Sequence, residues 1–139
     1  MPGVADYNSA IIEEFRANDG KVSGSWEGRE LLLLTTTGRK SGRAHTTPMV
    51  FTRDGDRLLV YASKGGAPKH PDWYVNLVAD PHVGVEVGPD RYDAIATPLE
   101  GEERDREFAA QAERIPIFGD YQAKAGRTIP VVALARAGD

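Results

Sequence analysis

The sequence predicts a small, mainly β protein in which six mostly antiparallel strands close into a barrel with flanking helices on its outside. Three observations lead to this fold class. Short runs of β-branched, aromatic and aliphatic residues occupy the middle and the end of the 139-residue chain. Turn-forming residues separate neighbouring runs, as antiparallel connections require. Strands of this kind leave edges that must be hidden, and closing the sheet into a barrel hides them.

The predicted strands are short and follow one another closely. They span residues 30–37, 43–52, 57–63, 82–87, 91–98 and 129–135. The first three form a meander, because a glycine-bracketed loop joins the first pair and an Asp-Gly-Asp turn joins the second. A Gly-Pro-Asp turn connects the fourth and fifth strands.

An amphipathic helix is predicted over residues 6–18. Ile11, Ile12 and Phe15 share one face of this helix. A helix lying on a membrane surface is the alternative interpretation, but Glu13 and Glu14 would be repelled by anionic lipid. We therefore favour a helix that packs on the rest of the protein.

Two further helices are predicted between and after the strands. Pro71 suits the first turn of a short helix, which ends before Pro81. Residues 102–114 form a highly charged helix in which Phe108, Ala109 and Ala112 are available to pack inward. Its carboxylates alternate with arginines, so they indicate a solvated helix face and not an acid–base pair.

Length and composition indicate one globular domain covering residues 1–139. The chain has 40% hydrophobic and 27% charged residues and shows no repeat or linker-like segment. A formal net charge of −4 gives no general attraction to nucleic acid, so we expect no nucleic-acid partner. The absence of cysteine excludes disulfides, thiolate metal sites and a cysteine nucleophile. Redox chemistry would need a bound cofactor.

A cytoplasmic location is expected. The first ten residues include Asp6 and no basic residue, which is the wrong charge order for a signal peptide. The aliphatic run at 31–34 is far too short to cross a bilayer, which needs about 20 residues. A peripheral contact with the inner face of the plasma membrane is an alternative that nothing in the sequence supports.

The loop at residues 38–43, Gly-Arg-Lys-Ser-Gly-Arg, concentrates positive charge. Its glycines allow the backbone N–H groups to converge, and Ser41 adds a hydroxyl beside Arg39 and Lys40. The loop can therefore hold a phosphate or a carboxylate. A solvated hairpin tip contains the same residue types, so both interpretations stand on local composition alone.

Polar or small residues interrupt two of the predicted strands. His45, Thr46 and Thr47 are followed by Pro48, which cannot donate to a central strand ladder. This pattern indicates either an edge strand or a place where something other than sheet pairing is accommodated. Tyr61 begins a stretch of small residues, beside which a planar ring can approach the backbone.

No metal site is predicted. His45, His70 and His82 lack the spacing of a metal-binding motif.

Four motifs together resemble the deazaflavin-dependent nitroreductase family. They are Gly-Arg-Lys-Ser-Gly at 38–42, Ser-Lys-Gly-Gly at 63–66, Pro-Asp-Trp-Tyr-Val-Asn-Leu at 71–77 and Asp-Tyr at 120–121. The resemblance extends from about residue 31 to residue 135. It implies a split β-barrel like that of the flavin-binding pyridoxamine-phosphate oxidases, coenzyme F420 as the cofactor, and reduction of quinones or, in some members, of nitroimidazole prodrugs.

The resemblance also implies roles for individual residues. Arg39, Lys40 and Ser41 would contact the phosphate and glutamate tail of F420. The path of the coenzyme would be lined by His45, Thr46, Thr47, Pro48, Met49 and Val50. The deazaflavin ring would be surrounded by Tyr61, Ala62, Ser63, Lys64, Asp72, Trp73, Tyr74, Val75, Asn76 and Phe118. The acceptor pocket would be formed by Val50, Ile115, Phe118 and Tyr121.

Departures from the family pattern fall near the acceptor. His45 stands where nitroimidazole-activating members carry an arginine, and Val50, Ile115 and Phe118 replace tyrosines, whereas Tyr121 is kept. A more apolar pocket favours a flat quinone over a nitroimidazole. The hypothesis is hydride transfer from reduced F420 to a quinone-like or nitroaromatic acceptor, with Tyr121 orienting or protonating it.

Two alternatives keep the same fold. One is an oxidoreductase that binds FMN, which also carries a phosphate and a flat tricyclic ring. The other is a non-enzymatic carrier of F420 or of a lipid. Either a monomer or a homodimer is compatible with the sequence.

Overall fold

The computed structural model describes residues 4–22, 31–66 and 68–137, so the first residue of the predicted strand at 30–37 lies outside the described part. The strands are β1 (Leu31–Thr37), β2 (Ala44–Val50), β3 (Thr52–Asp54), β4 (Arg57–Tyr61), β5 (His82–Val87), β6 (Asp90–Pro98) and β7 (Val131–Arg136). The helices are α1 (Val4–Ala17), α2 (Asp72–Ala79), α3 (Gly101–Arg114) and α4 (Ile117–Ala125), with a 3-10 turn η2 (Lys64–Gly66).

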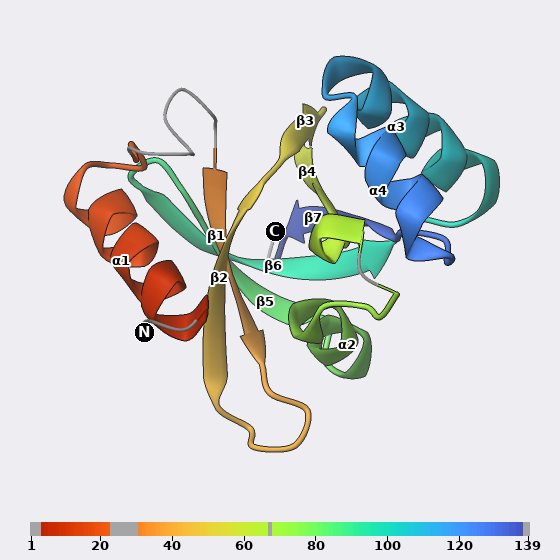
Figure 1. Ribbon diagram of the computed structural model, residues 1–139. Coiled ribbons are helices and arrows are strands. Elements are labelled where there is room, and N and C mark those ends of the chain that lie inside the picture. The colour runs from red at the N-terminus through yellow and green to blue at the C-terminus, as the bar shows by residue number, and fades with distance from the viewer. Residues whose placement is uncertain (1–3, 23–30, 67, 138–139) are drawn as a thin grey trace.

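The strands form one curled antiparallel sheet in the order β2-β1-β5-β6-β7-β4-β3 (Figure 1). The first and last strands of this order are consecutive in the chain, because β2 runs into β3 through the single residue Phe51. Val50 is paired with Leu31 of β1, whereas Thr52 is paired with Leu59 of β4. The chain therefore links the two ends of the sheet, and the predicted split β-barrel class is confirmed.

The prediction of six strands is wrong by one. The predicted strand at 43–52 is divided at Phe51, where the chain leaves its pairing with β1 and begins to pair with β4. A straight strand cannot follow both partners, so the ladder breaks and a seventh strand results. The predicted meander holds only in this divided form.

β1 is buried on both faces, which explains its unbroken aliphatic sequence. Leu32 and Leu34 lie in the barrel interior, whereas Leu31 and Leu33 contact Phe15 of α1. Alternate residues of a strand point to opposite faces, so four consecutive leucines serve two separate clusters. Burial of a side chain such as that of Phe15 stabilises the fold by about 1.5–3 kcal/mol.

β4 and β7 separate the barrel interior from the layer of α3 and α4. Val60 and Leu134 face the interior, while Tyr61 and Val131 contact the cluster beneath the two helices. α1 and the pair α3–α4 consequently lie on different sides of the barrel, as Figure 1 shows.

Three of the four helices confirm predictions, and α4 was not predicted. One prediction about α3 is wrong. Ala109 was predicted to face inward but is exposed, whereas Gln111 is buried with Phe108. Positions 108, 111 and 112 share the inner face because helical residues three and four apart are neighbours. Within the described residues, no helix is both long enough and apolar enough to cross a membrane.

Candidate functional site

The loop between β1 and β2 is a tight hairpin closed by its own backbone. The Gly38 amide donates to the Arg43 carbonyl at 2.8 Å, and the Gly42 amide donates to the Gly38 carbonyl at 2.8 Å. Gly42 has φ +70°, a conformation that favours glycine. The Arg43 amide donates to Ser41 Oγ at 3.1 Å. These three amides are engaged within the hairpin and are therefore not free to bind an anion.

Arg39 ties this loop to α2. Its backbone amide and its Nη1 both donate to Asn76 Oδ1, at 3.2 and 2.8 Å. Its Nη2 lies 3.6 Å from Asp72 Oδ1. Asn76 is buried and its Nδ2 donates to Thr36 Oγ1 at 3.3 Å. One buried amide thus fixes the basic loop, strand β1 and helix α2 relative to one another.

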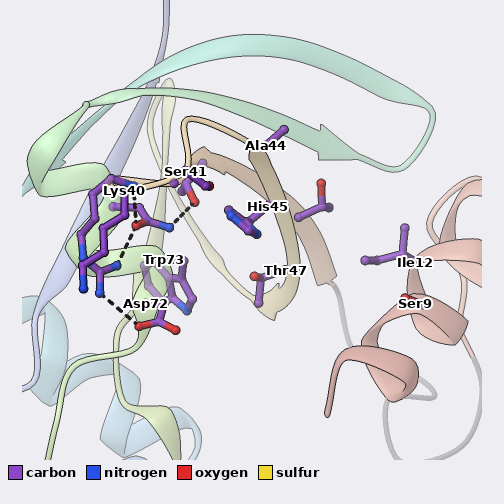
Figure 2. A pocket seen from close by; sticks show the side chains of 14 residues that line it. Ser9, Ile12, Lys40, Ser41, Ala44, His45, Thr47, Asp72 and Trp73 are labelled. Carbon is purple, nitrogen blue, oxygen red and sulfur yellow. Dashed lines mark hydrogen bonds and ion pairs between the residues drawn. The ribbon is translucent and has the colours of Figure 1, made fainter. Parts of the chain in front are cut away.

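A cavity of about 660 Å³ opens beside this junction. Its walls come from α1, the β1–β2 hairpin and α2, and Figure 2 shows His45 and Thr47 between Ile12 on one side and Trp73 on the other. The lining residues are Ser9, Ile12, Thr36, Gly38, Arg39, Lys40, Ser41, Ala44, His45, Thr46, Thr47, Asp72, Trp73 and Asn76. Nine residues of the predicted coenzyme site are therefore brought together here: Arg39, Lys40, Ser41, His45, Thr46, Thr47, Asp72, Trp73 and Asn76.

The cavity combines a basic end with an aromatic wall. Arg39 and Lys40 supply positive charge, against a single carboxylate from Asp72. The side chains of His45 and Ser41 lie close to the backbone of Gly38. A Cβ atom added at Gly38 would lie 2.9 Å from His45 Nε2 and 2.6 Å from Ser41 Oγ. A side chain at position 38 would therefore displace two residues of the site.

The predicted acceptor residues form a second group, on the outer face of β4. Phe118 stacks edge-on against Tyr61 at 5.6 Å and against Tyr121 at 5.5 Å between ring centroids. Val50 and Ile115 pack against the same cluster. Burial raises the pKa of the Tyr61 hydroxyl, which shares a 2.7 Å hydrogen bond with Thr52 Oγ1. The ring of Tyr61 thus belongs to this apolar cluster, while its hydroxyl is paired with Thr52.

The turn η2 brings the acceptor residue Tyr121 beside the segment predicted to hold the ring. A Cβ atom added at Gly66 would lie 3.1 Å from Tyr121 Cα, and Gly66 has φ +84°. Only glycine allows the backbone of η2 to approach α4 this closely. η2 therefore packs against α4, with Gly66 beside Tyr121.

The other residues predicted to contact the coenzyme do not line the cavity. Met49 belongs to the barrel interior, and Ala62 is fully buried at the end of β4. Pro48 is buried and Val75 is half-buried. Tyr74 packs against the interior cluster and lies 4.7 Å from the ring of His70.

Three cavity residues were missed by sequence reasoning. Ser9 and Ile12 come from α1, and Thr36 comes from β1. Ile12 was predicted to pack, and it does so partly, but its partial exposure to the cavity depends on how α1 docks. Among the described residues, no three His, Asp or Glu side chains are grouped so that they could hold a metal ion.

Comparisons with known proteins agree with the geometry. A sequence model of the F420H(2)-dependent quinone reductase family matches residues 9–136. The chain is 38% identical to an F420H(2)-dependent quinone reductase of Mycobacterium tuberculosis, over 88% of this chain and 85% of the relative.

Solved structures give the same result. An F420-H2 dependent reductase is 41% identical, with a TM-score of 0.68 over 75% of this chain and 92% of that chain. A domain-swapped dimer is 35% identical, with a TM-score of 0.70 over 95% and 99%. A pyridoxamine 5′-phosphate oxidase-like protein from Listeria innocua, 17% identical with a TM-score of 0.57 over 98% and 95%, shares the fold. The family model and the curated relative both cover most of the sequence, and the chain therefore belongs to the F420H(2)-dependent quinone reductase family.

Proposed function

We propose that the protein oxidises reduced coenzyme F420 and reduces a quinone-like acceptor. The observation that carries this proposal is the cavity between α1, the β1–β2 hairpin and α2, which joins Arg39 and Lys40 to the aromatic wall at Trp73. Membership of the quinone reductase family supports the same activity.

The residues of the cavity fit the chemistry of F420. The coenzyme carries a phosphodiester and several carboxylates at one end and a flat deazaflavin ring at the other. Arg39 and Lys40 match the anionic end, because guanidinium and ammonium groups form charge-assisted hydrogen bonds with such oxygens. Thr46, Thr47 and Ser41 add hydroxyl groups along the cavity, and Trp73 offers a planar face to a ring.

When bound, the coenzyme supplies the hydride, and the protein supplies binding, orientation and exclusion of water. Lys40 and Arg39 anchor the tail. Trp73 and Ile12 shield the cavity from water with apolar surface. Tyr121, which lies against η2 at the close approach of Gly66, orients the acceptor and can donate a proton from its hydroxyl.

The acceptor group, which contains Phe118 and Tyr121, favours flat, apolar substrates. Val50 and Ile115 add aliphatic surface without hydrogen-bond donors. A quinone ring can bind through apolar contacts and needs few hydrogen-bond donors. A nitroimidazole would lack the hydrogen bonds that tyrosine hydroxyls could donate in this pocket. Quinones should therefore be reduced faster than nitroaromatic compounds.

Titration of the purified protein with F420 and, separately, with FMN tests the cofactor. Quenching of coenzyme fluorescence should report F420 binding with much higher affinity than FMN binding. Tight FMN binding without F420 binding would instead support the FMN-dependent alternative.

Turnover separates the enzyme from a carrier. Adding menadione to the complex with reduced F420 should restore the absorbance of the oxidised deazaflavin. A reduced coenzyme that persists with menadione, with a longer-chain menaquinone and with a nitroaromatic compound would favour the carrier of F420 or lipid.

The assembly state and location are also proposed. A monomer or a homodimer fits the chain, and the similar structure described as a domain-swapped dimer supports testing the second. Light scattering during gel filtration should give the mass of one of these two states. Fractionation of cells should place the protein in the cytoplasm, and co-sedimentation with anionic vesicles tests peripheral membrane contact.

A further inference from the structure

Arg127 joins two segments that lie far apart in the sequence. It precedes β7, and its Nη2 donates to the carbonyl oxygens of Ala62 and Ser63, both at 3.2 Å. Its Nη1 lies 3.0 Å from His70 Nδ1. Ala62 and Ser63 follow β4, whereas His70 stands just before α2. One guanidinium group therefore holds the end of a strand and the beginning of a helix.

These are the two segments expected to flank the deazaflavin ring. The resemblance to the family implies that residues 61–64 and residues 72–76 surround the ring. His70 extends the link into α2, since its ring lies 4.7 Å from the ring of Tyr74. The positions of both sides thus depend on the same side chain.

Arg127 is itself held by a polar bracket. The side-chain amide of Gln122 donates to the Arg127 carbonyl, and Gln122 Oε1 accepts from the Ile129 amide at 3.0 Å. Arg104 donates to Gln122 Oε1 at 2.8 Å and to the Ile129 carbonyl at 2.7 Å. The bracket fixes residues 127–129 against α3 and α4, so Arg127 reaches the two ring segments from a rigid base.

The guanidinium group of Arg127 donates to neutral acceptors in its contacts with Ala62, Ser63 and His70. Burial lowers the pKa of His70, and the charge of Arg127 lowers it further, so His70 is neutral at pH 7 and accepts through Nδ1. Arginine retains its charge in proteins and presents several N–H groups in a fixed plane. This geometry suits the group to holding backbone carbonyls at set positions.

We propose that Arg127 is a positioning residue that sets the spacing of the two segments expected to flank the deazaflavin ring, by bridging Ala62 and Ser63 to His70. The proposal rests on the proposed F420-dependent function. It assigns ring binding partly to a residue that does not line the cavity beside the basic loop. Loss of the bridge should loosen the ring segments and leave the binding of the anionic tail unchanged.

Two ligands separate ring binding from tail binding. One is F420, and the other is the deazaflavin alcohol that lacks the phosphodiester and the glutamates. Arg127→Met should weaken both by the same factor, roughly fivefold to twentyfold, because charge-assisted hydrogen bonds are lost on the ring side only. Lys40→Ala should weaken F420 and leave the affinity for the tail-less ligand unchanged.

Arg57→Met is the matched control for stability. Arg57 donates to Asp54 and Glu103 and belongs neither to the bracket nor to the two ring segments. Its loss should lower the unfolding temperature and leave the affinity for the tail-less ligand within twofold of the wild type. His70→Asn and His70→Ala form a second pair, since asparagine can keep an acceptor near the Nδ1 position and alanine cannot. His70→Asn should bind the tail-less ligand more tightly than His70→Ala.

The outcomes distinguish failure of the proposed function from failure of the positioning role of Arg127. If the wild type binds neither ligand, the proposed function fails and the role of Arg127 fails with it. If the wild type binds both and Arg127→Met binds them equally well, only the positioning role is overturned. The role is also overturned if Arg57→Met loses as much affinity as Arg127→Met, because general destabilisation then explains both. If Arg127→Met does not fold, the His70 pair decides, and equal binding by its two members overturns the role.

Discussion

At Arg39, one guanidinium group has structural contacts and is also proposed to bind the coenzyme. It is held by Asn76 and lies near Asp72, yet it also faces the cavity. Lys40 lines the same cavity from an exposed position of the loop. Removal of Arg39 should therefore affect folding stability as well as coenzyme affinity, whereas removal of Lys40 should affect coenzyme affinity alone.

Arg39→Ala and Lys40→Ala should both weaken F420 binding. Each removes a charge-assisted contact of roughly 1.5–3 kcal/mol, which is about a tenfold or larger loss of affinity. Only Arg39→Ala should also lower the free energy of unfolding, because it releases the buried amide of Asn76. Fluorescence titration at low and high salt and urea unfolding measure the two effects. Unchanged affinity in both variants would remove the loop from the site.

Asp72→Asn tests the single carboxylate of the cavity. The side chain is 87% exposed and lies 3.6 Å from Arg39, so it competes weakly for the charge that should meet the anionic tail. Removing it should raise F420 affinity by roughly twofold to fivefold at low ionic strength, and the gain should shrink as salt screens the charges. Weaker binding by this variant would show instead that the Asp72 carboxylate accepts a hydrogen bond from the coenzyme.

Gln111 carries a buried polar group without a partner among the described residues. The residue is 1% exposed, its Oε1 accepts from Arg114 at 3.2 Å, and its Nε2 has no hydrogen-bond partner. Gln111→Met keeps the volume and removes the unpaired donor, so the free energy of unfolding should rise by about 1 kcal/mol. Urea unfolding measures the change, with exposed Glu113→Gln as a control that should change little. A loss of stability would show that the amide binds an internal water or ligand group.

At the scale of elements, α1 is held to the barrel by an ion pair as well as by Phe15. Arg16 Nε and Nη2 donate to the two carboxylate oxygens of Glu86 on β5, at 3.0 and 2.8 Å, and Arg91 lies 3.2 Å from the same carboxylate. The hydrogen bonds from Arg16, with the charges of both arginines, lower the pKa of Glu86 from its ordinary value of 4.5, although burial opposes them.

This shift predicts an acid-sensitive contribution to stability. Because the folded pKa lies below the unfolded value of 4.5, the contribution is present above that pH and is lost as the pH falls through the folded pKa. Glu86→Gln should lower the free energy of unfolding by about 1–3 kcal/mol at pH 7 and flatten its dependence on pH below 4.5. Urea unfolding at a series of pH values measures both. An unchanged slope would show that other carboxylates control acid unfolding.

Element prediction succeeded where pattern and packing agree and failed at α4. Ile115, Pro116 and Gly119 give the start of α4 the composition of a loop. In the structure Pro116 stands at the N-cap, where its missing N–H has no cost, and α4 ends at Gly126 with φ +67°. Gly119 sits inside the helix, where a Cβ atom would meet only Ala112 at an ordinary distance of 3.9 Å.

At the scale of the whole molecule, the cavity proposed to bind the coenzyme depends on contacts that no local pattern contains. The motif residues Arg39, Trp73 and Asn76 could be predicted, because their segments resemble those of a known family. Ser9 and Ile12 could not, since they reach the cavity only when α1 docks on β1. Arg127 is likewise an ordinary loop residue until the fold places it between β4 and α2.

A cavity assembled from three distant elements couples binding to the stability of the whole fold. α1, the β1–β2 hairpin and α2 come together only in the folded chain, so F420 should bind the native state and not the unfolded state. At a free concentration 100 times its dissociation constant, F420 should then raise the free energy of unfolding by about 2.7 kcal/mol. Thermal unfolding with and without the coenzyme measures this as a rise of several degrees. FMN at the same concentration should give little or no rise, and Lys40→Ala should need about ten times more F420 for the same shift. An equal rise with FMN would contradict the assignment of this cavity to the deazaflavin coenzyme.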